Sequence, residues 1–305
     1  MRTNALVKYL KAEKIDVVFA EYGMVGAMVA ESCKLASIPL IIHFHGADVH
    51  HRVTVNQYYD QYQQAFKYAS ALIAVSCDMA LALKQLGAPE DKIINASCGI
   101  DTAAFPAIDI SGSVRNFLSV GRFVEKKSPI SIVNAFKIVA DKYPDAKLWM
   151  IGQGPLYNET VDLVNTLGLQ NHITLTGILT QAQIKQLMQN MRCFVQHSVT
   201  AASGDMEGTP VSVLEASSSA LPVVSTCHAG IKEAVIDGVT GLLCDEYNIE
   251  AMAKNMITIA ENIDLAVKMG KAGRQHMIAA YEIKNRITLL DSIIKSSLLK
   301  FNPAL

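Results

Sequence analysis

The sequence predicts an α/β fold with two doubly wound, Rossmann-like domains. Short continuous apolar segments alternate with amphipathic helical patterns along most of the 305 residues, which is typical of buried parallel sheets. The alternation stops over residues 101–113, where Pro, Gly, Ser and Asp follow no clear period, and then restarts. A chain of this length is long enough for two domains.

The first half of the chain is expected to begin on a helix and to hold four strands. The strands are expected over residues 15–20, 38–44, 71–75 and 92–96, with helices over 24–35, 56–68 and 78–86. A parallel sheet usually begins on a strand with its glycine-rich ligand turn straight after it, and this turn is absent here. We therefore expect an N-terminally shortened version of a larger protein, with an incomplete first domain.

The second half repeats the alternation. Strands are expected over residues 116–120, 146–151, 172–175, 193–196 and 222–225, with helices over 129–142, 156–167, 181–190 and from near Pro210 and Ile231. From about residue 248 onward the pattern is helical. The expected domains are residues 1–107 and 108–281, with a last helix over 282–305 that packs back on the first domain.

Composition and charge exclude several classes of protein. The formal net charge of −1 argues against a dedicated nucleic-acid binder. No run of 18 or more uncharged apolar residues is present, and the polar and charged residues after Met1 lead us to expect no signal peptide. The six scattered cysteines lack the spacing of zinc ligands, so we expect reduced thiols in a cytoplasmic protein.

The segment GDMEGTPVSVLEA leads into an expected helix and contains two glutamates, Glu207 and Glu215, with seven residues between them. Thr209 can cap this helix and Pro210 suits its first turn. The free N–H groups of a helix that begins beyond the carboxyl ends of parallel strands favour a phosphate. Carboxylates beside a diphosphate would then accept hydrogen bonds from sugar hydroxyls. The alternative is a capped surface helix with two solvated glutamates.

Two further segments follow expected strands. In SVGRFVEKKSP, Gly121 turns the chain, and Arg122 and Lys127 come before a helix that Ser128 and Pro129 open. Two cations at this position suit a diphosphate, although an ordinary charged surface loop would have the same composition. In IGQGPL, residues 151–156, the two glycines are a weak signal that a tight turn between strand and helix explains equally well.

The segment HFHGADVHH, residues 43–51, carries four histidines. Imidazole is a common metal ligand, but no Cys or Glu completes the set, so we expect no metal. Asp48 could orient an acceptor or cap the next helix. An aromatic stripe allows loose membrane-surface association, although such a stripe is more often part of a core; it consists of Tyr58, Tyr59, Tyr62, Phe66 and Tyr68.

Several of these segments together are specific to one family. In order, GRFVEKKSP, IGQGPL, TGIL, DMEGTPVSVLEA and LPVVST–HAGIKEAVIDGVTGLL resemble the nucleotide-sugar-binding half of the family 4 retaining glycosyltransferases, which have the GT-B fold. The resemblance is strong over residues 115–260 and weaker over 15–101, where HFHGAD and SCGID carry it. The GDMEGTPVSVLEA segment is most similar to bacterial exopolysaccharide enzymes of the colanic-acid type.

The resemblance implies a role for each matching residue. It implies that Arg122 and Lys127 hold the donor diphosphate, that Glu207 and His45 lie at the transferred sugar, and that Glu215 binds the ribose hydroxyls. His45 rather than His43 matches the histidine of the family. Further implied substrate contacts are Gly121, Gly177, Ile178, Leu179, Gly208, Thr209 and Pro210, with residues 177–179 along the base. Ser128 stands where the motif usually has glycine, and we expect little effect.

The implied activity is that of a retaining hexosyltransferase. It would move a sugar from a nucleoside diphosphate sugar, such as a UDP- or GDP-sugar, to a glycan or lipid-linked acceptor at the cytoplasmic face of the membrane, with no metal required. One alternative is a truncated nucleotide-sugar-binding protein with little or no turnover. A scaffold that kept only the fold is a third class.

Overall fold

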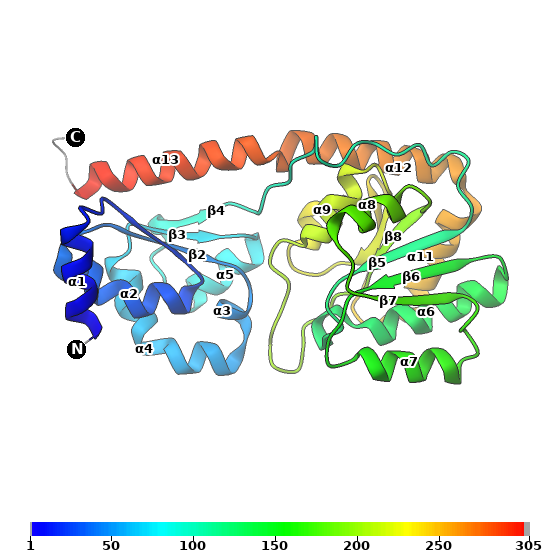
Figure 1. Cartoon of the computed structure of the whole chain (residues 1–305), viewed down its shortest axis with the longest axis horizontal. Coiled ribbons are helices and arrows are strands. Elements are labelled where there is room, and N and C mark those ends of the chain that lie inside the picture. The colour runs from blue at the N-terminus through cyan, green and yellow to red at the C-terminus, as the bar shows by residue number, and fades with distance from the viewer. Residues whose placement is uncertain (1, 302–305) are drawn as a thin grey trace. The chain divides into compact units, whose positions relative to one another are not determined.

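The computed structural model describes residues 2–301, with the side chain of Arg2 excepted, and its two compact units are drawn in Figure 1. Unit 1 comprises the described residues of Met1–Gly99, Ser203–Thr209 and Lys284–Leu305, and unit 2 comprises Ile100–Ala202 and Pro210–Ile283. Both units are parallel α/β structures, as the sequence predicts. The expected domain limits at residues 107 and 281 stay a prediction.

Unit 1 contains a four-stranded parallel sheet in the order β1-β2-β3-β4. Its strands are β1 Val18–Glu21, β2 Leu40–Phe44, β3 Ala71–Ala74 and β4 Ile93–Asn95. Its helices from the first part of the chain are α1 Arg2–Ala12, α2 Gly23–Ala36, α3 Ala47–His50, α4 Arg52–Tyr68 and α5 Cys77–Gln85, and η1 Glu90–Lys92 precedes β4. Strands β2 and β3 are buried along their whole length, which explains their continuous apolar sequences.

The two faces of this sheet are covered by different parts of the chain. Because strands in sequential order are joined by right-handed crossovers, the helices between them lie on one face. That face includes Ile42 and Phe44, which pack with Phe66 of α4. The alternate residue Ile41 points to the other face, where it packs with Ile293 of α13 (Ile283–Phe301), the long red helix in Figure 1. The end of the described chain therefore completes the core of unit 1.

The aromatic stripe of α4 belongs mainly to this core. Tyr62 and Phe66 are buried and stack on each other. The Tyr68 hydroxyl donates a hydrogen bond of 2.7 Å to the Ile38 carbonyl, and Tyr59 is exposed. The structure therefore favours a role for these aromatic side chains in the core of unit 1 over a role in contact with a membrane surface. Among the described residues, no helix combines the length and the apolar character needed to cross a membrane.

Unit 2 contains a six-stranded parallel sheet in the order β10-β9-β8-β5-β6-β7. Its strands are β5 Asn116–Val120, β6 Lys147–Ile151, β7 Ile173–Gly177, β8 Cys193–Gln196, β9 Val223–Thr226 and β10 Gly241–Cys244. The order reverses at β5, which pairs with both β6 and β8. In parallel α/β sheets, ligands bind beyond the carboxyl ends of the strands at such a reversal.

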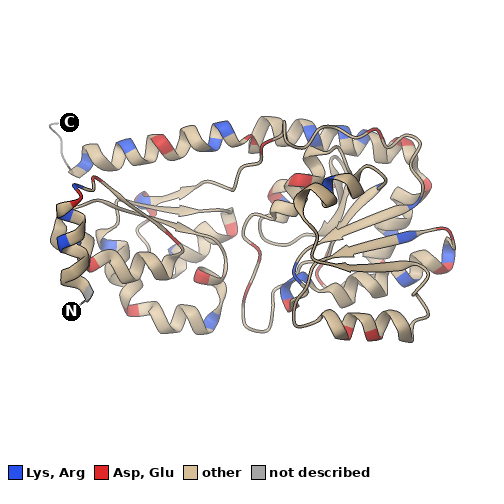
Figure 2. Ribbon diagram, in the orientation of Figure 1, with Lys and Arg blue, Asp and Glu red and all other residues tan. Residues whose placement is uncertain are grey.

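Helices surround the sheet of unit 2 and bury a core built around Phe117, Phe136 and Phe194. They are α6 Pro129–Lys142, α7 Tyr157–Thr166, α8 Gln181–Met188, α9 Val211–Ser218, α10 Ile231–Ala234, α11 Ile249–Glu261 and α12 Ile263–His276, with a short 3-10 helix η2 Glu125–Lys127 and a π-helix η3 Met277–Tyr281. Figure 2 shows Lys and Arg interspersed with Asp and Glu in both units, in keeping with the net charge of −1.

Candidate functional site

Two glycine-containing loops pack against each other at the carboxyl edge of the unit 2 sheet. A Cβ atom on Gly152 would lie 1.9 Å from the Gly121 carbonyl oxygen, and one on Gly154 would lie 2.4 Å from that of Phe123. The Phe123 N–H donates a hydrogen bond of 3.0 Å to the Gln153 carbonyl. Only glycine permits this approach, so the glycines of IGQGPL serve a tight turn and hold the neighbouring loop in place.

The expected cations lie on the loop that these glycines support. Arg122 is exposed directly after β5, and Lys127 is partly buried in η2. Both line a small hollow at the order reversal, together with Gly121 and with Gln196 at the end of β8. Helix α6 begins at Pro129, as expected. This loop therefore presents positive charge at the edge where a ligand of such a sheet binds.

Glu215 lies beside the loop that the resemblance assigns to the base. Gly177 ends β7 with a φ of 71°, and the Ile178 side chain that follows is 78% exposed. The Gln181 side chain, in the first turn of α8, donates a hydrogen bond of 2.8 Å to the Glu215 carboxylate. Burial raises the pKa of Glu215, while this hydrogen bond and the charge of Lys185 oppose the rise.

Thr209 does not cap α9, contrary to the expectation. Helix α9 begins at Val211, and Pro210 at its N-cap position provides no side-chain hydrogen bond. The Thr209 hydroxyl instead donates to the Val75 carbonyl at 2.8 Å and accepts from the Cys98 N–H at 3.0 Å. The Thr209 side chain bonds to residues of unit 1 and not to α9, because the segment Ser203–Thr209 packs in unit 1.

This segment brings Glu207 close to the loop that carries His45. A Cβ atom on Gly208 would lie 2.3 Å from the His45 carbonyl oxygen, and one on Gly46 would lie 3.3 Å from that of Met206. Glu207, between them, is only 6% exposed. Unit 1 thus joins His45, Glu207, Gly208 and Thr209, whereas the other expected site residues belong to unit 2.

Asp48 organises the turn that follows β2. Its buried carboxylate accepts hydrogen bonds from the N–H groups of Gly23 and Gly46 at 2.8 Å and of His45 at 3.1 Å. It does not cap the next long helix, α4, whose N-cap is His51. Because Asp48 fixes the backbone of the turn, it positions His45 indirectly.

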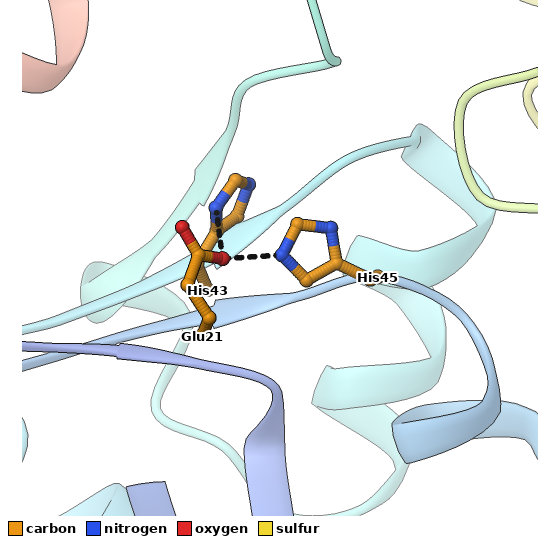
Figure 3. A group of neighbouring side chains, drawn as sticks. All are labelled: Glu21, His43 and His45. Carbon is orange, nitrogen blue, oxygen red and sulfur yellow. Dashed lines mark hydrogen bonds and ion pairs between the residues drawn. The ribbon is translucent and has the colours of Figure 1, made fainter. Parts of the chain in front are cut away.

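Figure 3 shows a cluster of Glu21, His43 and His45 at the carboxyl ends of β1 and β2. Oε2 of Glu21 lies 2.5 Å from Nε2 of His45 and 3.1 Å from Nδ1 of His43. The expectation that no Cys or Glu completes the histidine set is therefore wrong. Parallel pairing places Glu21 opposite His43, although they are far apart in sequence.

The two histidines of the cluster have opposite electrostatic surroundings. Burial alone would lower the pKa of His45, but hydrogen bonds with Cys98 and Glu21 outweigh it and raise the pKa to about 9. Burial and the adjacent His45 lower the pKa of His43, against the attraction of Glu21. His45 is therefore a cation at neutral pH and His43 is a neutral imidazole.

His43 is unsatisfied as a hydrogen-bonding group. Neither of its buried ring nitrogens has a full hydrogen bond among the described residues, and the nearest acceptor is Oε2 of Glu21, 3.1 Å from Nδ1. A buried polar group without a partner costs about 1–3 kcal/mol. Neither Glu21 nor Cys98 was a candidate from the sequence, and strand register was the signal that could have found Glu21.

Fold and site together define a parallel α/β protein with two units and a positively charged loop at the carboxyl edge of the second sheet. The family described as Glycosyl transferases group 1 matches residues 102–276, more than half of the chain, and the chain belongs to this family. Residues 2–104 match the description Glycosyltransferase Family 4. The expected resemblance to family 4 glycosyltransferases is therefore confirmed, whereas retention of the anomeric configuration stays a prediction.

Two of the curated relatives are described as glycosyltransferases of colanic acid and of amylovoran biosynthesis. The putative colanic acid biosynthesis glycosyltransferase WcaL of Escherichia coli is 29% identical over 252 residues, which are 81% of this chain and 62% of the relative. The amylovoran biosynthesis glycosyltransferase AmsK of Erwinia amylovora is 29% identical over 250 residues, 81% of this chain and 61% of the relative. The chain thus spans about three fifths of the length of these relatives.

Solved structures confirm the GT-B fold. Anabaena HepE in complex with UDP has a TM-score of 0.83 and 18% identity, over 96% of this chain and 82% of that one. A glycosyltransferase from Rickettsia africae has a TM-score of 0.82 and 19% identity, and the match covers 97% of this chain and 80% of that one. At such identities the likeness shows the fold alone.

Proposed function

We propose that this protein is a retaining glycosyltransferase of exopolysaccharide biosynthesis. It moves a sugar from a nucleoside diphosphate sugar to a glycan or lipid-linked acceptor. The observation that carries the proposal is the carboxyl edge of the unit 2 sheet, where Arg122 and Lys127 line a hollow at the reversal of strand order. The colanic acid and amylovoran relatives and the UDP complex of HepE support the substrate class.

Unit 2 holds the donor nucleotide in this proposal. Arg122 binds the diphosphate through two parallel hydrogen bonds, and Lys127 adds a point charge. The N–H groups at the start of α9, after Pro210, add further positive potential. Glu215 accepts hydrogen bonds from the ribose hydroxyls, and the exposed Ile178 contacts the base, between Gly177 and Leu179.

These groups neutralise the charge that develops on the leaving diphosphate. Such electrostatic stabilisation is usually the largest single contribution to lowering the barrier of the reaction. No metal is needed for this step, because the two cations and the helix terminus supply the charge. His45 and Glu207, with the backbone at Gly208 and Thr209, position the transferred sugar. An oxygen of the donor phosphate takes the proton of the acceptor hydroxyl.

A transfer assay tests the proposal. UDP-, GDP- and ADP-sugars are each incubated with a lipid-linked glycan acceptor, and NMR reads the anomeric configuration of the product. We expect one donor to react with retention, and Glu207→Gln to lower the rate by about 100-fold. Glu250→Gln, an exposed glutamate of α11, is the control. An inverted product would exclude retention, and donor binding without transfer would favour the binding-protein alternative.

A further inference from the structure

We propose that Glu21, His43 and His45 form a binding site for a transition-metal ion such as Zn²⁺. The three side chains converge in Figure 3 from the ends of two paired strands. Their candidate ligand atoms, Oε2 of Glu21, Nδ1 of His43 and Nε2 of His45, all lie within 4.8 Å of one another. Two imidazoles and one carboxylate are a known set of three protein ligands that leaves a position open on zinc.

The scaffold suits coordination. His43 and His45 are two residues apart where β2 ends, and their rings have centroids 4.2 Å apart. Four ligands at zinc bond lengths of 2.0–2.1 Å are separated by about 3.3 Å in a tetrahedron. The present separations of 3.1 and 2.5 Å from Glu21 therefore need small shifts, and His45, a cation in the free protein, must release its proton to the solvent when the ion binds. The Glu21 side chain is 57% exposed and is free to make them.

His43 gives an independent indication of a ligand. It is buried on the central strand β2 and directs Nδ1 at Glu21, yet neither ring nitrogen makes a hydrogen bond within the described chain. Buried polar side chains are almost always partnered, and an orphaned one needs a physical explanation. Coordination through Nδ1 would replace its 3.1 Å approach to Glu21 with a bond to the ion, and Nε2 would stay without a partner among the described residues.

The ligand chemistry selects the ion. Imidazole nitrogen suits zinc, copper and nickel, whereas Mg²⁺ and Ca²⁺ prefer sites made of oxygen ligands. A bound ion would engage Nε2 of His45, so it would compete with the contact between His45 and the donor sugar. Inhibition by zinc rests on the proposed function, whereas the metal site itself does not.

Direct metal binding tests the site without any assay of turnover. The chain is freed of metal with a chelator and then titrated with Zn²⁺ against a chromophoric chelator. We expect one ion to bind with micromolar affinity or better, and Mg²⁺ not to compete. Glu21→Gln and His43→Gln should each weaken binding by about tenfold or more. His172→Gln is the matched control, because this half-buried histidine of unit 2 lies outside the cluster.

Equal zinc affinity in the wild type, Glu21→Gln and His43→Gln would overturn the proposal. Circular dichroism of the metal-free variants checks folding, and Glu21→Gln keeps the test decisive if the buried His43→Gln variant does not fold. Inhibition of transfer by zinc is measured separately. Tight binding without inhibition would support the metal site and contradict the role of His45 at the donor sugar.

Discussion

In unit 1 the candidate residues are part of the packing, whereas in unit 2 the candidates Arg122 and Ile178 are exposed on loops at the edge of the sheet. Gly208 approaches the His45 carbonyl, and Asp48 binds the backbone on either side of the turn. Arg122 and Ile178, in contrast, are exposed at the edge of the unit 2 sheet. Substitutions of the unit 1 candidates should therefore reduce both stability and activity, and substitutions of Arg122 and Ile178 should reduce ligand binding alone.

Gly208→Ala should have the largest effect on stability. The new Cβ atom would lie 2.3 Å from the backbone oxygen of His45, which cannot move as a side chain does. We expect a loss of about 3 kcal/mol, measured by chemical denaturation. The control is Gly112→Ala, where a Cβ atom meets nothing within 4 Å. Equal stability of the two variants would show that the approach of residues 203–209 to His45 is wrong.

Asp48→Asn should be slightly less damaging. An amide keeps one acceptor oxygen but turns an NH₂ group toward backbone N–H donors, so at least one of them loses its partner. We expect a loss of about 2–3 kcal/mol in the free energy of unfolding. Asp16→Asn, an exposed control, should be neutral. A neutral Asp48→Asn would mean that the turn does not depend on this carboxylate.

A buried histidine makes the stability of unit 2 depend on pH. Burial lowers the pKa of His197 from 6.5 to about 4, with a smaller contribution from His228 and against the attraction of Glu246. The unfolded chain therefore binds the proton more tightly, so stability is fully present above pH 6.5 and falls as the pH drops toward 4. The loss should reach about 3 kcal/mol at pH 4.

The acid limb of the stability profile measures this effect. His197→Gln keeps an acceptor for the Tyr247 N–H and should flatten the profile between pH 6.5 and 4. His172→Gln should leave the slope as it is in the wild type. A slope that survives His197→Gln would assign the pH dependence to other groups.

The smallest expected effect is at Ser128, where glycine should be more favourable than alanine. The free energy of unfolding of each variant is measured by chemical denaturation. The Ser128 φ of 38° and ψ of 58° lie in the left-handed region, which costs a residue with a Cβ about 1–2 kcal/mol. Ser128→Gly should therefore be more stable than Ser128→Ala by about 1 kcal/mol. At Ser131, the hydrogen-bond partner of Ser128 inside α6, the order should reverse. The same order at both positions would contradict the backbone conformation at Ser128.

The alternation of apolar segments predicted the strands of both sheets well, because buried parallel strands are continuous apolar runs between helices. Strands β5 and β8 begin and end at the expected residues. Strand β10 was not expected, since Gly241–Cys244 is short and is only partly buried at the sheet edge. The position of Arg122 and Lys127 at the carboxyl edge of the sheet could be predicted from the sequence, because it depends only on where strand β5 ends.

Contacts between distant segments could not be predicted in the same way. Glu21 joins His43 and His45 only through strand register. Thr209 appears to be a helix cap in sequence, but its hydroxyl bonds with Val75 and Cys98, far away along the chain. Local patterns contain no information on such pairings, so the sequence placed the unit 2 candidates better than those of unit 1.

The most direct test of the donor site is a thermal-shift titration with UDP, GDP, ADP and their sugars. The wild type is compared with Arg122→Ala and with Arg115→Ala, an arginine just before β5 that pairs with Asp145. We predict that one nucleotide raises the melting temperature of the wild type and of Arg115→Ala. Arg122→Ala should melt like the wild type without ligand and bind about tenfold more weakly or worse. No shift with any nucleotide, or an equal shift in Arg122→Ala, would contradict a donor site at this edge of unit 2.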